Sequence, residues 1–161
     1  ATENGEQTQC VQNCIGKIRL FTFMNRYDKA DARNPIDYLV HIKKIALPLY
    51  PQFGTEPNVY YIPPINTPES FNKQLFGPGA AKAVEMYKNA IQDKSLVALL
   101  MLFGCTGKII HSFEVQGDIE TGHCIGYDEK GKEIIKVPIK EPIVIREKHD
   151  KERNVNRISI S

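Results

Sequence analysis

The sequence predicts an α+β fold in which a helical region is followed by a small antiparallel sheet. Apolar residues recur at helical spacing in residues 35–45, 69–76 and 80–91, and the apolar stretch 96–103 extends the helical region. From Lys108 onward, apolar and polar residues alternate with a period of two, which is typical of strands. The 161 residues, 42% of them hydrophobic, suffice for one domain with a core and hardly for two.

Composition and charge exclude several classes of protein. With 21 basic and 19 acidic side chains the formal net charge is only +2, so a nucleic-acid partner, which selects for clustered positive charge, is not expected. The longest apolar run, Leu96 to Phe103, is far shorter than the roughly 20 residues of a membrane span, so the chain is not expected to be transmembrane. The first residues are polar and acidic and lack an initiator methionine, so we expect a processed or truncated piece.

The first part of the chain predicts a short strand, a loop and a helix. Residues 17–23 have the pattern of a short strand, and the polar residues 25–33 indicate a surface loop. Asn34 followed by Pro35 is a typical helix start, because Asn caps the first turn and Pro fits within it. We expect this helix to run to about Ile45.

The helix that begins at Pro35 carries one polar stripe. Asp37, His41 and Lys44 fall at positions i, i+4 and i+7, while much of the remainder is apolar. We therefore expect the helix to be well buried on its other sides. His41 is expected to be a solvated side chain rather than a ligand.

Residues 46–64 form a proline-rich segment, which we call the strap. Its 19 residues contain five prolines, which forbid a regular helix, together with three tyrosines and one phenylalanine. We expect a rigid, extended segment that packs against another surface. That surface is either its own domain or another subunit, since aromatic residues are enriched in the cores of interfaces.

The second half predicts helices followed by a sheet. Beyond the helices, Ile109, Phe113 and Val115 fall on one face of the first strand, with further strands expected at 124–127, 133–139 and 142–146. Gly131 lies in the turn between two of these strands. The tail 146–157 mixes both signs of charge and is expected to be a solvated arm, or an arm that wraps a partner.

The four cysteines divide into a pair and two single residues. Cys10 and Cys14 form a Cys-x-x-x-Cys motif, which places two thiols on one side of a helical turn, close enough to bind metal; the alternative is a pair of buried free thiols. An iron–sulfur cluster or a structural zinc needs about four protein ligands, so the remaining ligands would lie elsewhere. Cys105 and Cys124 lack companion spacing and are expected to be small buried side chains.

These motifs together resemble a known family. Residues 10–19 (CVQNCIGKIR), 46–51 (ALPLYP), 54–58 (GTEPN) and 60–64 (YYIPP) are similar to the last cysteine motif, and the segment after it, in the iron–sulfur (beta) subunits of molybdenum oxidoreductases. This family includes respiratory nitrate reductases, nitrite oxidoreductases, selenate and chlorate reductases and ethylbenzene dehydrogenase. The segments FGPG at 76–79 and VPIKEPI at 137–143 look closest to the nitrite oxidoreductase branch, and the resemblance runs from about Cys10 to Arg146.

The resemblance implies a piece of a larger subunit. Subunits of the family hold three 4Fe–4S clusters and one 3Fe–4S cluster on two ferredoxin-like modules. Residues 1–24 would be the end of one such module, and residues 25–161 a carboxy-terminal α+β region with the strap and a docking surface. Cys10 and Cys14 would be the third and fourth ligands of the last cysteine group, with Cys10 on one 4Fe–4S cluster and Cys14 on its neighbour.

The resemblance also implies a function and partners. The chain would be the carboxy-terminal part of an electron-transfer subunit that relays electrons between a molybdenum cofactor on a catalytic (alpha) subunit and a haem- or quinone-linked partner. That partner would be a haem or membrane-anchor (gamma) subunit in a membrane-associated prokaryotic complex, whose reaction would interconvert nitrite and nitrate. We further infer, apart from the resemblance, that Lys17 and Arg19, next to the motif, would moderate the negative charge of the clusters and raise their reduction potentials; the alternative is that both are surface or structural charges.

One departure from the family supports an alternative function. The chain contains no Cys-x-x-Cys, so it cannot assemble a complete cluster by itself. The alternative is therefore a non-redox protein-binding or assembly module with metal-free cysteines, in which the strap and the charged tail dock a protein partner.

Overall fold

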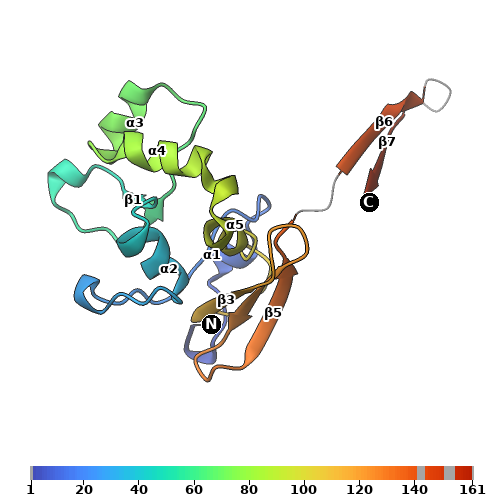
Figure 1. The fold of residues 1–161 in the computed structure, drawn as a ribbon. Coiled ribbons are helices and arrows are strands. Elements are labelled where there is room, and N and C mark those ends of the chain that lie inside the picture. Colours follow the sequence, from blue (N-terminus) through green and yellow to red (C-terminus); the bar gives the residue numbers. More distant parts are fainter. Residues whose placement is uncertain (1, 141–143, 151–154, 161) are drawn as a thin grey trace.

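The computed structural model describes residues 2–140, 144–150 and 155–160 and confirms the α+β class (Figure 1). In chain order the α-helices, short 3-10 or π turns (η) and strands are η1 Thr2–Asn4, α1 Gln9–Gln12, η2 Tyr27–Lys29, α2 Pro35–Asp37, η3 Tyr38–Ile42, β1 Leu47–Pro48, η4 Pro51–Phe53, β2 Tyr60–Tyr61, α3 Glu69–Phe76, α4 Ala80–Lys88, η5 Ala90–Gln92, α5 Lys94–Leu100, β3 Ser112–Gln116, β4 His123–Tyr127, β5 Glu133–Pro138, β6 Val144–Asp150 and β7 Val155–Ile160. None of the helices in these ranges is long and apolar enough to cross a membrane.

The apolar helix α5 and the sheet β3-β4-β5 form the centre of the core. Leu96, Ala98 and Leu99 of α5 are almost fully buried and belong to one cluster with Phe113 of β3 and Cys124 of β4. The side chain of Asp93 caps α5 by accepting a hydrogen bond from the backbone of Leu96, as the chemistry of a helix start requires. The predicted helix over 96–103 is thus present, although it begins at Lys94 and ends at Leu100.

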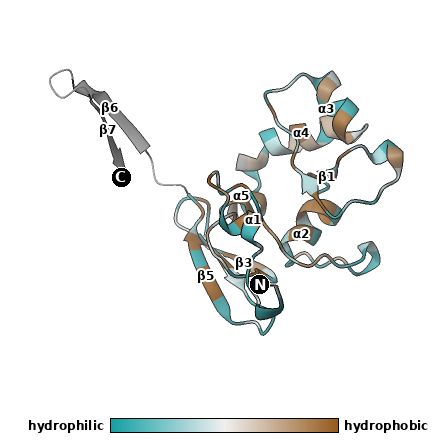
Figure 2. Ribbon diagram, turned by 180° about the vertical axis from the view of Figure 1, so that it is seen from behind, coloured by the Kyte–Doolittle hydropathy of each residue, from teal (hydrophilic) through white to brown (hydrophobic). Residues whose placement is uncertain are grey.

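The predicted antiparallel sheet is confirmed. β3 pairs with β4 and β4 with β5, so that Val115 lies opposite Cys124, which in turn lies opposite Val137. β5 carries both hydrophobic and hydrophilic residues, which alternate from Ile135 to its end at Pro138 (Figure 2). Gly131 occupies the predicted turn between β4 and β5 with φ of 74°, a left-handed conformation that favours glycine.

The helix that begins at Pro35 starts as predicted and ends early. Asn34 caps it by accepting hydrogen bonds from the backbone amides of Ile36 and Asp37. The α-helical turn then widens into the π-helical η3, and the chain leaves the helix at Ile42 rather than Ile45. The physical reason is local: two residues further on, Lys44 has φ of 54°, which no right-handed helix tolerates.

The prediction of a polar stripe on this helix is wrong for Asp37. Its side chain is fully buried and accepts three hydrogen bonds: from the Asn25 backbone at 2.9 Å, the Asn25 side chain at 2.7 Å and the Asp31 backbone at 3.0 Å. The ring of His41, which was expected to be solvated, lies 3.0 Å from the Asn25 carbonyl oxygen, to which Nε2 can donate. Both side chains therefore bind the loop 25–33 to the helix. The polar side chains on this helix face the polar loop that covers them and not solvent alone.

The predicted strand at residues 17–23 is absent. This segment is irregular, and none of its residues pairs with another strand in the described part of the chain. Lys17 has φ of 51°, which interrupts the extended conformation, and the backbone amide of Phe21 donates to the side chain of Gln7 instead of to a strand. An alternating sequence of apolar and polar residues does not form a strand when no neighbouring strand is available to pair with it.

The charged tail contains strand pairing that the sequence did not predict. β6 and β7 pair antiparallel, with Val144 opposite Ile160 and Arg146 opposite Ile158. β-Branched residues such as Val144, Ile158 and Ile160 favour strands, and the prediction of a solvated or partner-wrapping arm stays a prediction. The predicted strand at 142–146 is present from Val144; residues 141–143, including the end of the VPIKEPI motif, lie outside the described residues.

The strap closes on itself instead of running as one extended segment. Leu47 and Pro48 of β1 pair with Tyr61 and Tyr60 of β2, so the residues between them form a loop. Tyr60 and Ile62 pack against the core, which supports the prediction that the strap covers its own domain. The loop itself presents exposed apolar side chains, which keeps the second prediction, of a docking surface, open; these are Tyr50, Phe53, Val59 and Tyr61.

The buried carboxylate of Asp37 generates a stability prediction. Asp37→Ala is expected to lower the free energy of unfolding by about 2–4 kcal/mol, because it leaves three donors without their acceptor. The matched control is Asp28→Ala in the same loop, whose ion pair with Arg26 is largely exposed and is expected to change stability by less than about 0.5 kcal/mol. Urea denaturation of the two variants measures the difference, and equal effects would contradict the role given to Asp37.

Candidate functional site

The two cysteines of the motif lie at the surface near the start of the chain. Cys10 is inside α1 and exposed; Cys14 is half-buried and lies two residues beyond the end of that helix. Cys10 therefore lies in the predicted helical turn, but the helix ends before Cys14. The backbone amide of Cys14 donates a hydrogen bond to the carbonyl oxygen of Val11 at 3.2 Å. Both cysteines are free of disulfides, and since neither is buried, the alternative of a buried thiol pair is wrong.

The sulfur of Cys14 lies where backbone amides favour its negatively charged form. The pKa of the Cys14 thiol is lowered, chiefly by a hydrogen bond from the Ile18 backbone amide; partial burial opposes this shift, and the charge of Arg19 and the amides of Gly16 and Lys17 add to it. Lys17 has a left-handed φ of 51°, and its amide closes a turn by donating to the carbonyl oxygen of Cys14 at 3.2 Å. A thiolate is the form that binds metal.

Arg19 closes the segment after Cys14 back onto α1. Its Nη1 donates a hydrogen bond to the carbonyl oxygen of Cys10 at 3.1 Å, across nine residues of chain. The Cys10 sulfur lies 3.0 Å from the Thr8 hydroxyl oxygen, so either group can donate between them. The two cysteines are thus held within one short segment, Thr8 to Arg19, which we call the cysteine segment.

Gln7 attaches the cysteine segment to the rest of the domain. This side chain is almost fully buried; Nε2 donates to the Lys108 carbonyl at 3.1 Å, and Oε1 accepts from the Phe21 amide at 3.1 Å. Its backbone amide donates to the Gly107 carbonyl at 2.7 Å, and its own carbonyl accepts from the Gln12 side chain at 2.7 Å. Nothing in the sequence pattern singles out Gln7, since its role depends on Phe21, 14 residues away, and on Gly107 and Lys108, about 100 residues away along the chain.

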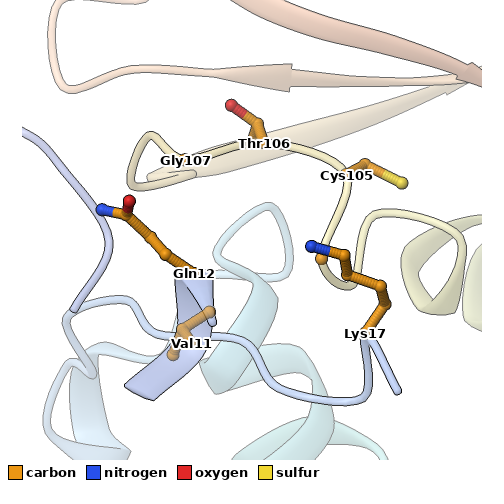
Figure 3. Close-up of a pocket in the computed structure, with 7 residues that line it drawn as sticks. Val11, Gln12, Lys17, Cys105, Thr106 and Gly107 are labelled. Carbon is orange, nitrogen blue, oxygen red and sulfur yellow. The ribbon is translucent and has the colours of Figure 1, made fainter. Parts of the chain in front are cut away.

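A cavity of about 320 Å³ lies between the cysteine segment and the loop that follows α5. Figure 3 shows Gln12 and Lys17 at opposite ends of it, with the loop that carries Cys105, Thr106 and Gly107 along another side and Lys17 near Cys105. The aliphatic part of Lys17 lies tight against Gly104: a Cβ on that glycine would meet Lys17 Cβ at 2.6 Å. Gly104 has φ of 66°, so both its conformation and its contact require a glycine.

The two remaining cysteines do not join the motif. Cys124 is fully buried, as predicted, and burial together with the neighbouring Cys105 raises the pKa of its thiol to about 12. Cys105 was predicted to be buried and is exposed; its sulfur donates to the Met101 carbonyl at 2.8 Å, and partial desolvation raises the pKa of its thiol. Neither is a candidate ligand on these grounds.

The donor set at the cysteine segment fits a shared iron–sulfur site rather than a complete one. Two accessible sulfurs, one of them favoured as thiolate, are soft anionic ligands of the kind that iron–sulfur clusters use. Within residues 2–140, 144–150 and 155–160, no three histidine, cysteine or acidic side chains are grouped so as to hold a metal ion. A cluster bound here would need ligands from another segment or chain.

Comparison with known proteins identifies relatives of one kind. The chain is 38% identical over 99 residues to the chlorate reductase subunit beta of Ideonella dechloratans and, over the same length, to the selenate reductase subunit beta of Thauera selenatis; each match covers 51% of this chain and 29% of the relative. It is 42% identical over 60 residues to the respiratory nitrate reductase subunit beta of Haloferax mediterranei, covering 37% of this chain and 16% of the relative. No protein-family model matches the chain.

These relatives confirm the resemblance to beta subunits of molybdenum oxidoreductases. The chain spans less than a third of the length of the curated relatives it matches. The predicted ferredoxin-like character of its first residues stays a prediction.

The thiol environments predict an order of chemical reactivity in the reduced, metal-free chain. Cys14 is expected to react with iodoacetamide at neutral pH well before Cys105, because the pKa of the first thiol is lowered and that of the second raised. Cys124 is expected to remain unmodified, since with a pKa of about 12 roughly one thiol in 10⁵ is ionised at pH 7. Time-resolved peptide mass spectrometry measures the order, and labelling of Cys105 as fast as Cys14 would contradict it.

Proposed function

We propose that this chain is the carboxy-terminal part of an electron-transfer iron–sulfur subunit of a molybdenum oxidoreductase. The observation that carries the proposal is the cysteine segment: two accessible sulfurs in a Cys-x-x-x-Cys motif, with backbone amides turned toward the second. The relatives support it, because proteins similar to about half of the chain are named as beta subunits of two reductases and a dehydrogenase.

Within this proposal Cys10 and Cys14 are ligands of two neighbouring 4Fe–4S clusters. Such clusters supply reversible one-electron storage when bound. The protein contributes two thiolates, a hydrogen bond from the Ile18 amide to the Cys14 sulfur, and the arginine that bonds the Cys10 carbonyl. Residues 1–24 would complete a ferredoxin-like module whose other ligands come from outside this chain segment, and residues 25–161 would form the region that braces it.

The proposed partners follow from the same assignment. A catalytic (alpha) subunit would carry the molybdenum cofactor, and a haem or membrane-anchor (gamma) subunit would exchange electrons at the other end of the relay, in a membrane-associated complex. The proposed reaction interconverts nitrite and nitrate: nitrite and water give nitrate, two protons and two electrons. The chemistry of that reaction would occur on the alpha subunit, and this chain would carry the electrons.

The strap gives the proposed complex a docking surface. Tyr50, Phe53, Val59 and Tyr61 are 38%, 71%, 57% and 43% exposed, although such side chains normally favour burial. The first three lie on the loop between β1 and β2, and Tyr61 lies in β2 itself. Exposed aromatic residues of this kind are typical of interface cores.

The same surface favours a second candidate function, a protein-binding or assembly module without redox activity. In that case the strap would dock a protein partner while both cysteines remain metal-free. The two functions differ in iron content, since only the first requires iron and acid-labile sulfide in the intact complex.

Substitution of Cys14 tests the ligand assignment. In the full subunit within its complex, Cys14→Ser is expected to abolish or alter one 4Fe–4S signal in electron paramagnetic resonance, because a neutral hydroxyl replaces a thiolate ligand. The matched control is Cys105→Ser, which changes an exposed cysteine with no proposed ligand role and is expected to leave the spectrum unchanged. An unchanged spectrum and iron content in Cys14→Ser would contradict the assignment, and a complex without iron or labile sulfide would favour the non-redox function.

Substitution of Phe53 tests the docking surface. Phe53→Ser is expected to weaken assembly with the alpha subunit by about tenfold or more, because an aromatic hot-spot residue contributes about 2 kcal/mol or more to binding and about 1.4 kcal/mol corresponds to a factor of ten. The matched control is Tyr27→Ser, an aromatic residue of similar exposure, 67%, on the loop held by Asp37. Size-exclusion chromatography of the co-expressed subunits measures assembly, and equal yields of complex from both variants would contradict the role of the strap.

A further inference from the structure

The two basic side chains that follow Cys14, Lys17 and Arg19, contact different parts of the structure. Arg19 turns back to α1, where its guanidinium bonds the Cys10 carbonyl at 3.1 Å. Lys17 turns the other way, with its aliphatic chain packed on Gly104 and its charge acting on the Cys105 thiol. Figure 3 shows Lys17 beside the loop that carries Cys105, across the cavity from Gln12.

Arg19 contacts the cysteine motif with its side chain, and Lys17 does not. The guanidinium of Arg19 donates to the carbonyl oxygen of Cys10 at 3.1 Å, which places a positive charge against the motif. The side chain of Lys17 packs instead on Gly104 and lines the cavity together with Cys105. The sequence places both cations close to the motif, and the structure separates them.

We propose that Arg19, and not Lys17, is the positioning residue of the cysteine segment: its bond to the Cys10 carbonyl fixes the approach of the two sulfurs, and its charge raises the reduction potential of the clusters bound there. This inference rests on the proposed function. Reduction adds one electron to a cluster and transfers no atom, so the reduced form carries one more negative charge. A fixed positive charge nearby stabilises that form, and an arginine stays protonated at every pH of interest.

Three variants of the full subunit in its complex separate the charge of Arg19 from its geometry. Arg19→Gln removes the charge, Arg19→Lys keeps the charge but loses the planar donor fork, and Lys17→Gln removes the neighbouring charge as the matched control. The measurement is the midpoint potential of each 4Fe–4S signal in a mediated redox titration followed by electron paramagnetic resonance. A low ionic strength, near 0.01 M, limits screening, since the Debye length is then about 30 Å.

The expected result is a lower midpoint potential in Arg19→Gln for at least one of the clusters, a potential closer to that of the unchanged protein in Arg19→Lys, and no shift in Lys17→Gln. Iron and labile-sulfide content, measured on the same samples, tests the proposed function separately, because it reports whether clusters are bound at all. Where Arg19→Gln loads no iron, Arg19→Lys decides: a loaded complex with its potential near that of the unchanged protein supports the inference. Two results in iron-loaded complexes would overturn the inference. Either Arg19→Gln leaves every midpoint potential unchanged, or Lys17→Gln shifts a midpoint potential as far as Arg19→Gln does. Both results would leave the proposed iron–sulfur function intact.

Discussion

The placement of the cysteine segment depends on the buried amide side chain of Gln7. Its Nε2 donates to the carbonyl oxygen of Lys108 in the loop after α5, and its Oε1 accepts from the backbone amide of Phe21 in the irregular segment 17–23. A buried amide without partners would cost about 1–3 kcal/mol, so the domain is stable with Gln7 inside only when both segments are in place. Gln7 therefore connects the cysteine segment both to the residues that follow it and to the loop after α5, which leads into the core.

This anchoring leaves the thiols accessible while the rest of the segment is fixed. Cys10 and Cys14 are not buried, and backbone amides after Cys14, chiefly that of Ile18, lower the pKa of its thiol. Cys124 shows the opposite arrangement, since it is fully buried in the core and its thiol is held neutral. One short chain thus contains both accessible and fully buried cysteines, and their surroundings distinguish them where the residue type does not.

The sequence was informative wherever local chemistry decides the structure. The Asn34 cap, the apolar helix α5 and the alternating strands β3 to β5 all follow from spacing and capping, and the structure contains them. The cysteine motif and the strap were equally visible, and the relatives confirm the resemblance that these motifs indicated.

The errors concern contacts between distant segments. Asp37 was placed on a polar face because a helical pattern does not reveal that the loop 25–33 covers it with three donors. The segment 17–23 alternates like a strand, but Gln7 takes the amide that a neighbouring strand would have bonded. Such choices depend on which segments meet in the fold, and local patterns carry no information about that.

The central claim is that the sulfurs of Cys10 and Cys14 each bind iron. Anomalous X-ray diffraction at the iron absorption edge, from crystals of the intact complex, tests it most directly, because it locates iron without reference to activity. The account predicts iron within bonding distance of both sulfurs, in two separate clusters. Sulfurs without iron, or joined to each other in a disulfide, would contradict it.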